Sequence, residues 1–271
     1  MKQDTSTSQP PAAQIDQRAV RGPFDIIGDI HGCASEVADL LALLGYTQNR
    51  AGVWGSTSGR TAVFIGDLVD RGPQNVDAVR LVMSMVQAGH GFCVPGNHDL
   101  QLTAYLSGAP VPIVYGLDVT LREMDRESPE SRSEIQGFFE RLPSHYLFDD
   151  GRLVIAHTGL PEALHGVDTP EVRRLAAYGT AEGETDPGDI AQRHSWVDLY
   201  RGTASVVFGH TRVLEPIWRN NTIDIDTGCV YGWRLTALQW PERRLLSVPA
   251  RQPYVRSTRP FLPAGQVPAT S

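Results

Sequence analysis

The chain has 271 residues and a formal net charge of −7, with 41% hydrophobic and 20% charged residues. This is the composition of an ordinary globular protein, and it excludes a collagen-like, coiled-coil or wholly disordered chain. The acidic balance also argues against general binding of nucleic-acid backbones.

The sequence predicts neither a membrane helix nor a secretory signal peptide. No stretch approaches the roughly 18 apolar residues of a membrane helix, and the polar N-terminus lacks the apolar segment of a signal peptide. The three cysteines, Cys33, Cys93 and Cys229, are widely spaced and contain no CxxC pair. That pattern excludes a disulfide framework and a zinc ribbon. We therefore expect a cytoplasmic protein that is not associated with membranes.

Both ends of the chain differ in composition from its middle. Residues 1–21 are rich in Ser, Thr, Gln and Pro, and they predict a disordered leader. Residues 251–271 contain four prolines, three arginines and no acidic residue, and they predict a Pro-rich extended tail. A single folded domain is expected over residues 22–250.

The first half of this domain alternates strand and helix patterns. A β-like run at 24–27 is followed by apolar residues at helical spacing from Val37 to Leu44, with Gly45 as the expected end of the helix. A second run at 62–65 precedes a helix that Pro73 opens. A third run lies at 91–94.

The second half is helical in pattern at first and then mainly strands. Residues 116–142 are charged and helical, with breaks near Pro129 and Pro143. Short apolar runs follow at 153–156, 205–208, 222–225, 235–239 and 245–248. The pattern predicts a mixed α/β domain in which sheets pack together with helices outside.

Potential metal ligands follow five of the strand-like runs. They are Asp29 and His31, Asp67, Asn97 and His98, His157, and His210. Ligands at strand ends can meet at one edge of a sheet although they are far apart in sequence. Glycine directly precedes Asp29, Asp67, Asn97 and His210, which lets the backbone approach a metal or a phosphate closely. Asp, His and Asn without thiolates suit Mn, Fe, Zn or Co, and six ligands suffice for two ions if one Asp bridges.

These blocks also carry a resemblance. GDIHG (28–32), GDLVDRG (66–72), GNHD (96–99), AHTG (156–159) and GHT (209–211) resemble the calcineurin-like metallophosphoesterases, and within them the phosphoprotein-phosphatase-type branch. YGT-x₂-GET (178–185) and IDTGCVYG-x-RLTALQWPE (225–242) are similar to bacterial PrpE-type diadenosine-tetraphosphatases and to the phosphatase domain of bacterial polynucleotide kinase-phosphatase. No kinase P-loop is present. The resemblance implies an α/β (α+β) fold, a β-sandwich of two mixed sheets flanked by helices.

The resemblance further implies a role for each matched residue. Asp29 and His31 would hold a first divalent ion, Asp67 would bridge, and Asn97, His157 and His210 would complete the second site. Manganese is favoured, with Fe, Co, Ni or Zn as alternatives. A metal-bridging hydroxide would attack the phosphoryl group in line. His98, oriented by Asp70, would protonate the leaving oxygen, and Arg71 would bind the phosphate.

The substrate is less firmly indicated than the chemistry. The whole-domain similarity favours a bis(5′-nucleosyl)-tetraphosphatase that cleaves diadenosine tetraphosphate. The alternatives are a serine/threonine protein phosphatase, or a phosphomonoesterase or phosphodiesterase acting on nucleotides and RNA ends such as 2′,3′-cyclic phosphates. Arg193 and Trp196 are expected on the substrate side. Asp99-Leu100-Gln101 departs from the relatives, which often carry Glu or Cys followed by Asn-Lys, and so removes a cation near the site.

Several further His, Cys and Asp residues have no expected role as catalytic residues or metal ligands. His90, His145, His165 and His194 match no ligand block, and we expect them at the surface or in ordinary packing. Cys33 follows GDIHG directly, but the mechanism needs no thiol, and packing is preferred. Asp226 is either a partner of a metal ligand or a turn residue. The alternative to an enzyme is a catalytically inactive phosphate-binding module, and the complete ligand set argues against it.

Overall fold

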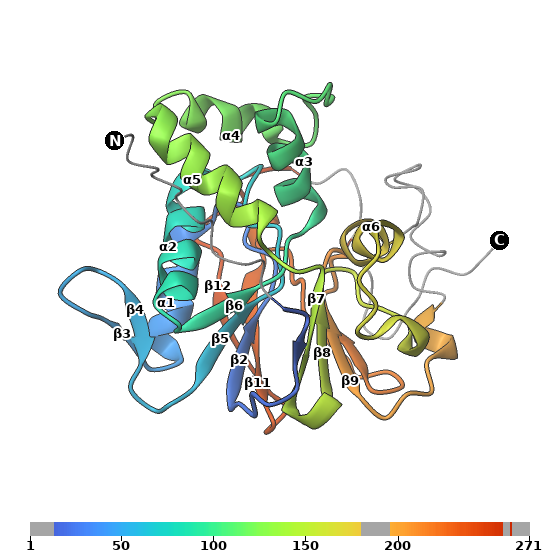
Figure 1. Cartoon of the computed structure of the whole chain (residues 1–271). Helices are drawn as coiled ribbons and strands as arrows, with labels where there is room; N and C mark the ends of the chain where they lie inside the picture. The colour runs from blue at the N-terminus through green and yellow to red at the C-terminus, as the bar shows by residue number, and fades with distance from the viewer. Residues whose placement is uncertain (1–13, 180–195, 257–260, 262–271) are drawn as a thin grey trace, which may run out of the picture.

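The computed structural model describes residues 14–179, 196–256 and 261 (Figure 1). The α-helices are α1 (Ala34–Leu43), α2 (Asn75–Gln87), α3 (Asn97–Leu106), α4 (Leu117–Met124), α5 (Pro129–Glu140) and α6 (Pro170–Tyr178). The strands are β1 (Asp16–Gln17), β2 (Phe24–Ile27), β3 (Tyr46–Gln48), β4 (Trp54–Ser56), β5 (Thr61–Phe64), β6 (Gly91–Cys93), β7 (His145–Phe148), β8 (Leu153–Ala156), β9 (Ser205–Phe208), β10 (Thr222–Asp224), β11 (Arg234–Trp240) and β12 (Arg244–Pro249). Short 3₁₀ turns are η1 (Asp149–Gly151), η2 (Glu162–Leu164) and η3 (Cys229–Tyr231).

Two mixed five-stranded sheets form the centre of the molecule. One has the order β12-β11-β2-β5-β6 and the other β1-β7-β8-β9-β10. Within them β2, β5 and β6 run parallel, as do β8, β9 and β10, whereas β11 pairs antiparallel with β2. The expected sandwich of two mixed sheets flanked by helices is therefore confirmed.

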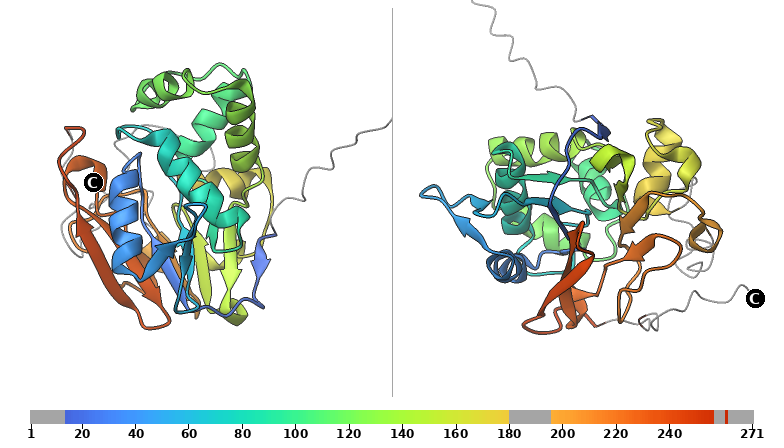
Figure 2. Two further views of the ribbon diagram at one scale, coloured as in Figure 1. Left: turned by 90° about the vertical axis from the view of Figure 1, so that its left-hand side faces the viewer. Right: turned by 90° about the horizontal axis from the view of Figure 1, so that it is seen from below.

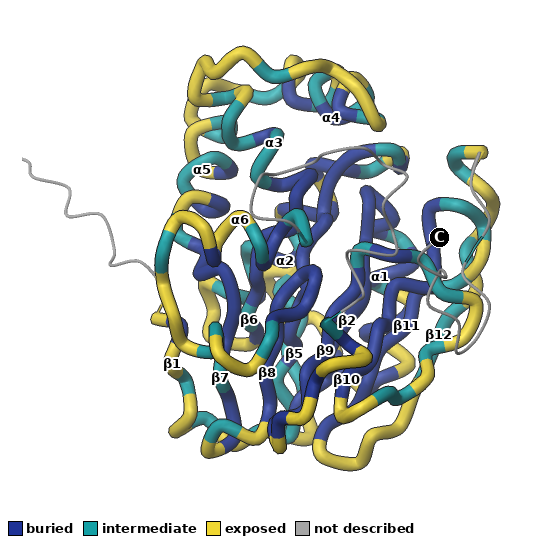
Figure 3. The backbone as a smooth tube through the Cα atoms, turned by 90° about the vertical axis from the view of Figure 1, so that its right-hand side faces the viewer, coloured by how far each residue is buried: buried dark blue, intermediate teal, exposed yellow. Residues whose placement is uncertain are grey.

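Three hydrophobic layers hold the sandwich together. The two sheets face each other across a core that includes Phe24, Val63, Phe148 and Ile155. Helices α1 and α2 cover the other face of the first sheet (Figure 2, left), and α6 covers the outer face of the second. Because the central strands are covered on both faces, their sequences are continuous apolar runs rather than alternating ones. Figure 3 shows them buried along most of their length.

The helical segment 116–142 divides as its prolines predict. Pro129 occupies the first turn of α5, where its missing N–H costs nothing, and Ser128 caps the helix by accepting a hydrogen bond from the Ser131 N–H at 3.2 Å. Helices α3, α4 and α5 together lie above one end of the two sheets (Figure 1).

At both ends the described residues make contacts outside the expected domain bounds of 22–250. The leader was expected to be disordered to residue 21, but Asp16–Gln17 pairs in parallel with β7 and Ile15 is buried. The tail was expected to begin at 251, but Arg251 binds Asp39 of α1 through its side chain at 2.8 Å. Each terminal segment therefore adds contacts to the domain. Among the described residues no helix has the length and hydropathy to cross a bilayer.

Candidate metal centre

The six candidate ligands lie in the loops that follow five strands of the two sheets. Asp29 and His31 follow β2, Asp67 follows β5, Asn97 begins α3 after β6, His157 follows β8 and His210 follows β9. The parallel strands of each sheet end at the same edge, and the sheets face each other, so residues up to 181 positions apart come into contact.

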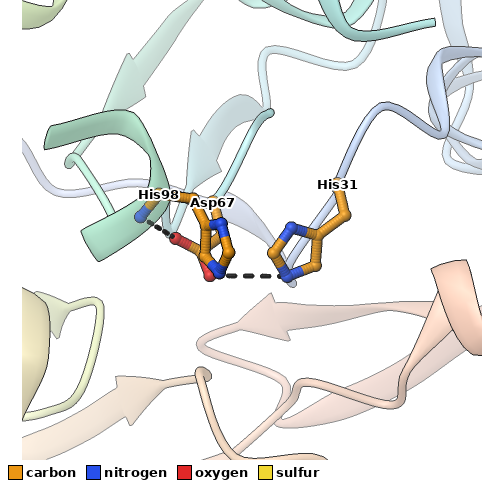
Figure 4. Close-up of side chains that lie close together, drawn as sticks. All are labelled: His31, Asp67 and His98. Carbon is orange, nitrogen blue, oxygen red and sulfur yellow. Dashed lines mark hydrogen bonds and ion pairs between the residues drawn. The ribbon is translucent and has the colours of Figure 1, made fainter. Parts of the chain in front are cut away.

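Asp67 lies at the middle of the cluster. Its Oδ2 is 3.4 Å from Nε2 of His31 and 3.4 Å from Nε2 of His157, on two sides. Its Oδ1 accepts a hydrogen bond from the backbone N–H of His98 at 3.1 Å. Asp67 is therefore shared by two groups that could each hold an ion, one with His31 and His98 and one with His157 and His210. Figure 4 shows the first group.

Two of the histidines are oriented by backbone carbonyls. Nδ1 of His31 lies 2.9 Å from the Val69 carbonyl oxygen, and Nδ1 of His157 lies 2.9 Å from that of Ile65. A carbonyl accepts only, so each ring carries a proton on Nδ1 and turns its Nε2 toward Asp67. Carbonyl-oriented imidazoles of this kind are typical metal ligands.

The remaining candidate ligands lie beside His157. Its Nε2 is 3.3 Å from Oδ1 of Asn97 and 3.2 Å from Nδ1 of His210. The Asp29 carboxylate accepts the backbone N–H of His210, at 3.1 Å to Oδ2. All six residues are thus gathered in one place, and their roles as ligands stay a prediction.

The charges within the cluster are mutually dependent. Burial would raise the pKa of Asp67, but the neighbouring His157, His98 and His31 outweigh it and hold the pKa well below its usual range. Burial raises the pKa of Asp29 well above its usual range, and the nearby Asp226 and Asp67 add to this effect. Buried carboxylates at such density need compensating positive charge, which divalent cations supply.

Two glycines allow the carboxylates to lie where they do. A Cβ at Gly96 would be 2.0 Å from Oδ1 of Asp67, and a Cβ at Gly209 would be 2.1 Å from Oδ1 of Asp29. No real side chain tolerates such contacts, so these positions accept glycine only. This is the close approach that the glycines before the ligand blocks predict.

The backbone itself is strained around the cluster. His31, Asp67, Asp70, Arg71 and His210 all have φ between 45° and 74°, in the left-handed region. Non-glycine residues rarely adopt it, and such outliers gather at functional sites because the surrounding structure enforces them.

A second polar group lies directly beside the first candidate ion site. Nδ1 of His98 is 2.6 Å from Oδ2 of the fully buried Asp70, which also accepts a hydrogen bond from the Thr120 hydroxyl. Nε2 of His98 lies 2.8 Å from Nη2 of Arg71, whose Nη1 contacts Nε2 of His31. Arg71 therefore reaches both histidines with its planar fork, and the three residues expected to act on the substrate are adjacent.

Asp99 has a role that the sequence did not reveal. It is fully buried, and its carboxylate accepts the N–H of Leu68 and the N–H of Gly96, both at 2.9 Å. It therefore joins the loop of Asp67 to the start of α3. Burial raises its pKa to about 7. Thr120, 50 positions from Asp70, was missed for the same reason, since only the tertiary structure joins the two.

Asp226 is buried and accepts the N–H of Gly228, and its charge acts on Asp29, so it is both a turn residue and a neighbour of a candidate ligand. Trp196 packs against Phe208 and Tyr200, and its expected contact with substrate stays a prediction. Arg193 and His194 lie outside the described residues. Cys33 is buried, as expected.

The match to a known protein family identifies the family of this chain. The family model described as calcineurin-like phosphoesterase matches residues 22–232. The chain belongs to this family. Calcineurin-like phosphoesterases use a dinuclear divalent metal centre, and the structure gathers His and Asp residues that could bind metal. The chain is thus a metal-dependent phosphoester or phosphoanhydride hydrolase.

Two curated relatives of this calcineurin-like chain carry the same name. It is 41% identical over 248 residues to "bis(5′-nucleosyl)-tetraphosphatase PrpE [asymmetrical]" of Anoxybacillus flavithermus, covering 88% of this chain and 99% of the relative. It is also 41% identical to the protein of that name from Bacillus subtilis, covering 86% and 97%. The resemblance seen in the motifs is therefore confirmed.

Solved structures agree with the fold. A crystal structure provisionally described as a diadenosine tetraphosphatase is 26% identical with a TM-score of 0.61, covering 88% of this chain and 98% of its own. A protein serine/threonine phosphatase from Saccharomyces cerevisiae, 15% identical, matches with a TM-score of 0.57 over 89% and 84%. At that identity the second likeness supports the calcineurin-like fold alone.

Proposed function

We propose that this chain is a bis(5′-nucleosyl)-tetraphosphatase that hydrolyses diadenosine tetraphosphate and related dinucleotides with Mn²⁺. The observation that carries the proposal is the 41% identity, over 86–88% of the chain, to relatives that bear this name. Their name specifies asymmetrical cleavage, so ATP and AMP are the expected products. The geometry around Asp67 supports the hydrolytic part of the proposal, since four histidines surround its carboxylate and Arg71 contacts two of them.

The donor set fits two divalent ions. Asp29, His31 and Asp67 would hold one, and Asp67, Asn97, His157 and His210 the other. Oxygen and imidazole donors without thiolate suit Mn²⁺, with Fe, Co, Ni or Zn as alternatives. When bound, such a pair of ions supplies Lewis-acid stabilisation of the phosphoryl group and activates the attacking water.

The chain's own side chains would do the rest. Nη2 of Arg71 and Nε2 of His98 lie 2.8 Å apart, so both can reach the oxygens of one phosphoryl group. Arg71 would bind and orient that group through its planar fork. His98 would deliver a proton from Nε2 to the leaving oxygen, while Asp70 keeps the ring in the required orientation through Nδ1.

The charge of the protein is compatible with this role. A chain with a net charge of −7 repels a polyphosphate at long range. Two divalent ions opposite the carboxylates of Asp29 and Asp67 leave a net positive centre, so the metals rather than an excess of Lys and Arg would attract the substrate.

A panel of metals and substrates tests the proposal. Purified protein would be assayed with Mn, Ni, Co, Fe, Zn and Mg against diadenosine tetraphosphate, a phosphoserine peptide, a 2′,3′-cyclic nucleotide and p-nitrophenyl phosphate, with chromatography of the products. Equal amounts of ATP and AMP, formed fastest with Mn²⁺, are expected. Intact diadenosine tetraphosphate beside a dephosphorylated peptide or an opened cyclic phosphate would replace the proposal with one of those activities.

The cytoplasm is the compartment we propose. All three cysteines are free and buried, and proteins with unpaired thiols are typical of reducing compartments.

A further inference from the structure

A second arginine lies next to the catalytic one. Arg212 comes two positions after His210, and its guanidinium carbon is 4.1 Å from the ring centre of Tyr231. The guanidinium carbon of Arg71 is 5.7 Å from the same ring centre. One aromatic ring thus joins Arg71, which contacts both His31 and His98, to a cation that the mechanism above does not use.

The turn that carries Tyr231 is braced from outside. Tyr231 is the last residue of η3, which lies between β10 and β11. The carbonyl oxygen of Val230 accepts the backbone N–H groups of Tyr254 and Val255, at 3.0 and 3.2 Å. The Tyr254 hydroxyl in turn donates to the buried Glu36 of α1 at 2.7 Å. The ring is therefore held on a fixed support.

Arg212 is also in contact with an aromatic ring from the C-terminal segment. Its guanidinium carbon lies 5.6 Å from the ring centre of Phe261. Space for that ring exists because residue 228 is glycine: a Cβ there would lie 2.4 Å from Cε1 of Phe261. Arg212 thus lies against two rings, one from the domain and one from the chain beyond residue 256.

Stacking of this kind prepares an arginine to bind an anion. Rings occupy the face of the guanidinium group, whereas its N–H donors lie in the plane and point outward. The positive charges of Arg212 and Arg71 both act on the buried Asp226, so the two guanidinium groups share one electrostatic environment beside the candidate metal centre. A chain of linked phosphates bound at Arg71 therefore comes within the field of Arg212 as well.

We propose that Arg212 is a specificity residue that binds the phosphate groups beyond the one under attack. The inference rests on the proposed function, since it assumes a substrate with a chain of linked phosphates. A phosphomonoester needs only Arg71 and the ions. A polyphosphate chain extends its negative charge past Arg71, and Arg212 is the next cation around the Tyr231 ring. Arg212 would then select nucleoside polyphosphates against simple esters.

Steady-state kinetics of the Mn²⁺-loaded enzyme test this selection. R212A should raise the KM for diadenosine tetraphosphate about 10- to 100-fold, the range for a lost charge-assisted hydrogen bond, with little change in kcat. The KM for p-nitrophenyl phosphate should stay the same. R212K, which keeps the charge without the planar fork, should fall between. Equal effects on both substrates, or none on either, would overturn the proposal.

Arg243 offers a matched control. Its guanidinium carbon lies 4.3 Å from the Trp218 ring centre and 5.7 Å from that of Trp240, and it binds Ser205 at the opposite end of β9 from His210. R243A removes an arginine stacked on aromatic rings far from the site, so both KM values should stay as in the wild type. Thermal unfolding of each variant would verify that the fold persists.

Inhibition of p-nitrophenyl phosphate hydrolysis separates this inference from the proposed function. With excess Mn²⁺, tripolyphosphate should inhibit the wild type, and R212A should weaken that inhibition about tenfold or more while inhibition by inorganic phosphate is unchanged. If the wild type leaves diadenosine tetraphosphate intact but the tripolyphosphate effect depends on Arg212, the proposed function fails and the polyphosphate site stands. If the wild type cleaves the dinucleotide but tripolyphosphate inhibits R212A as strongly as the wild type, the proposed function stands and the polyphosphate site fails.

Discussion

The Asp70 carboxylate lies 2.6 Å from Nδ1 of His98, and it is fully buried while doing so. Because an ionised carboxylate only accepts hydrogen bonds, His98 carries a proton on Nδ1 and turns Nε2 toward Arg71 and the candidate ligands. Asp70 therefore fixes the orientation of the His98 ring, and Nε2, which accepts from Arg71 here, is the atom that would carry a proton to the leaving oxygen.

Replacing His98 by Ala should lower kcat about 10²- to 10⁴-fold, the usual contribution of a positioned acid or base. The loss should be larger for phenyl phosphate than for p-nitrophenyl phosphate, because phenol is the weaker acid and needs the proton more. Kinetics with the two esters, alongside the metal content of the variant, would measure both effects. Equal losses on the two esters would mean that His98 does not act as the acid.

Asp70→Asn should lower kcat less than His98→Ala does, and again by a larger factor for phenyl phosphate than for p-nitrophenyl phosphate. The amide keeps the size of the side chain but no longer fixes the proton on Nδ1 of His98. A D70N enzyme as fast as the wild type on phenyl phosphate would contradict the orienting role.

Gly96→Ala should disrupt the metal centre while changing little else. Gly96 has φ −90°, which any residue adopts, so the effect comes only from the Cβ that would lie 2.0 Å from Oδ1 of Asp67. We expect the bound metal to fall by at least one ion per chain and activity to fall more than about 100-fold, because both ions depend on Asp67. Metal analysis after gel filtration would measure the loss.

The control for this substitution is Gly137→Ala in α5. The new Cβ there would meet only the far end of Arg141, and Ala stabilises a helix interior by about 0.5–1 kcal/mol relative to Gly. Normal metal content in G137A and reduced content in G96A is the expected pair of results. If G96A also retained both ions, the close approach to Asp67 would not matter for binding.

His145 should contribute a pH dependence of stability opposite in sign to that of the buried carboxyl group of Asp99, whose pKa is raised to about 7. His145 is fully buried, and its Nε2 accepts the N–H of Gly166 at 2.9 Å. Burial lowers its pKa from the usual 6.5 to about 4. Below pH 6.5 the unfolded chain binds a proton that the folded chain does not bind at this site, so the contribution of His145 to stability falls as the pH drops from 6.5 toward 4, by up to about 3 kcal/mol.

Urea unfolding at several pH values between 7.5 and 4.5 would show this slope. His145→Gln, which can still accept a hydrogen bond but does not titrate, should be less stable at pH 7.5 and should lose less stability on acidification. Parallel curves for the variant and the wild type would assign the acid sensitivity to other groups.

The parts of the fold that were predictable are those in which a local pattern coincides with burial. Strands β8 and β9 match the expected runs residue for residue, because strands covered on both faces are uniformly apolar. Strands β3 and β4 escaped notice, since they are three residues long and largely polar or exposed. Helix α6 was not predicted, although Thr169 and Pro170 form a helix start signal in which the Thr169 hydroxyl accepts the N–H of Val172.

The candidate site was predictable for a different reason. Each candidate ligand follows a strand, which predicts convergence at the edge of a sheet. That Asp29 and His210, 181 positions apart, meet across two different sheets was implied only by the resemblance to the family. Residues that act through the loops were not accessible in this way. Asp99 stands within the GNHD block, but its bond to the Leu68 N–H depends on how two loops meet. The Tyr231 ring beside Arg71 depends on the fold in the same way.

Replacing Arg60 should lower the free energy of unfolding without changing kcat. Arg60 pairs with the buried Asp25 at 2.8 Å and donates to the carbonyl oxygens of Phe24 and Trp240, at the end of β2 away from Asp29. Arg60→Ala would leave Asp25 buried without its charged partner, which costs about 3–5 kcal/mol. The kcat of the folded fraction should be unchanged at low temperature, because no contact of Arg60 reaches the candidate ligands. Adding Asp25→Asn should recover part of the loss, since it removes the uncompensated charge while the amide oxygen can still accept from Gln239 and the amide nitrogen can donate to the Tyr46 hydroxyl oxygen. Urea unfolding of the two variants measures both steps, and a double variant no more stable than R60A would show that packing, not the buried charge, sets the cost.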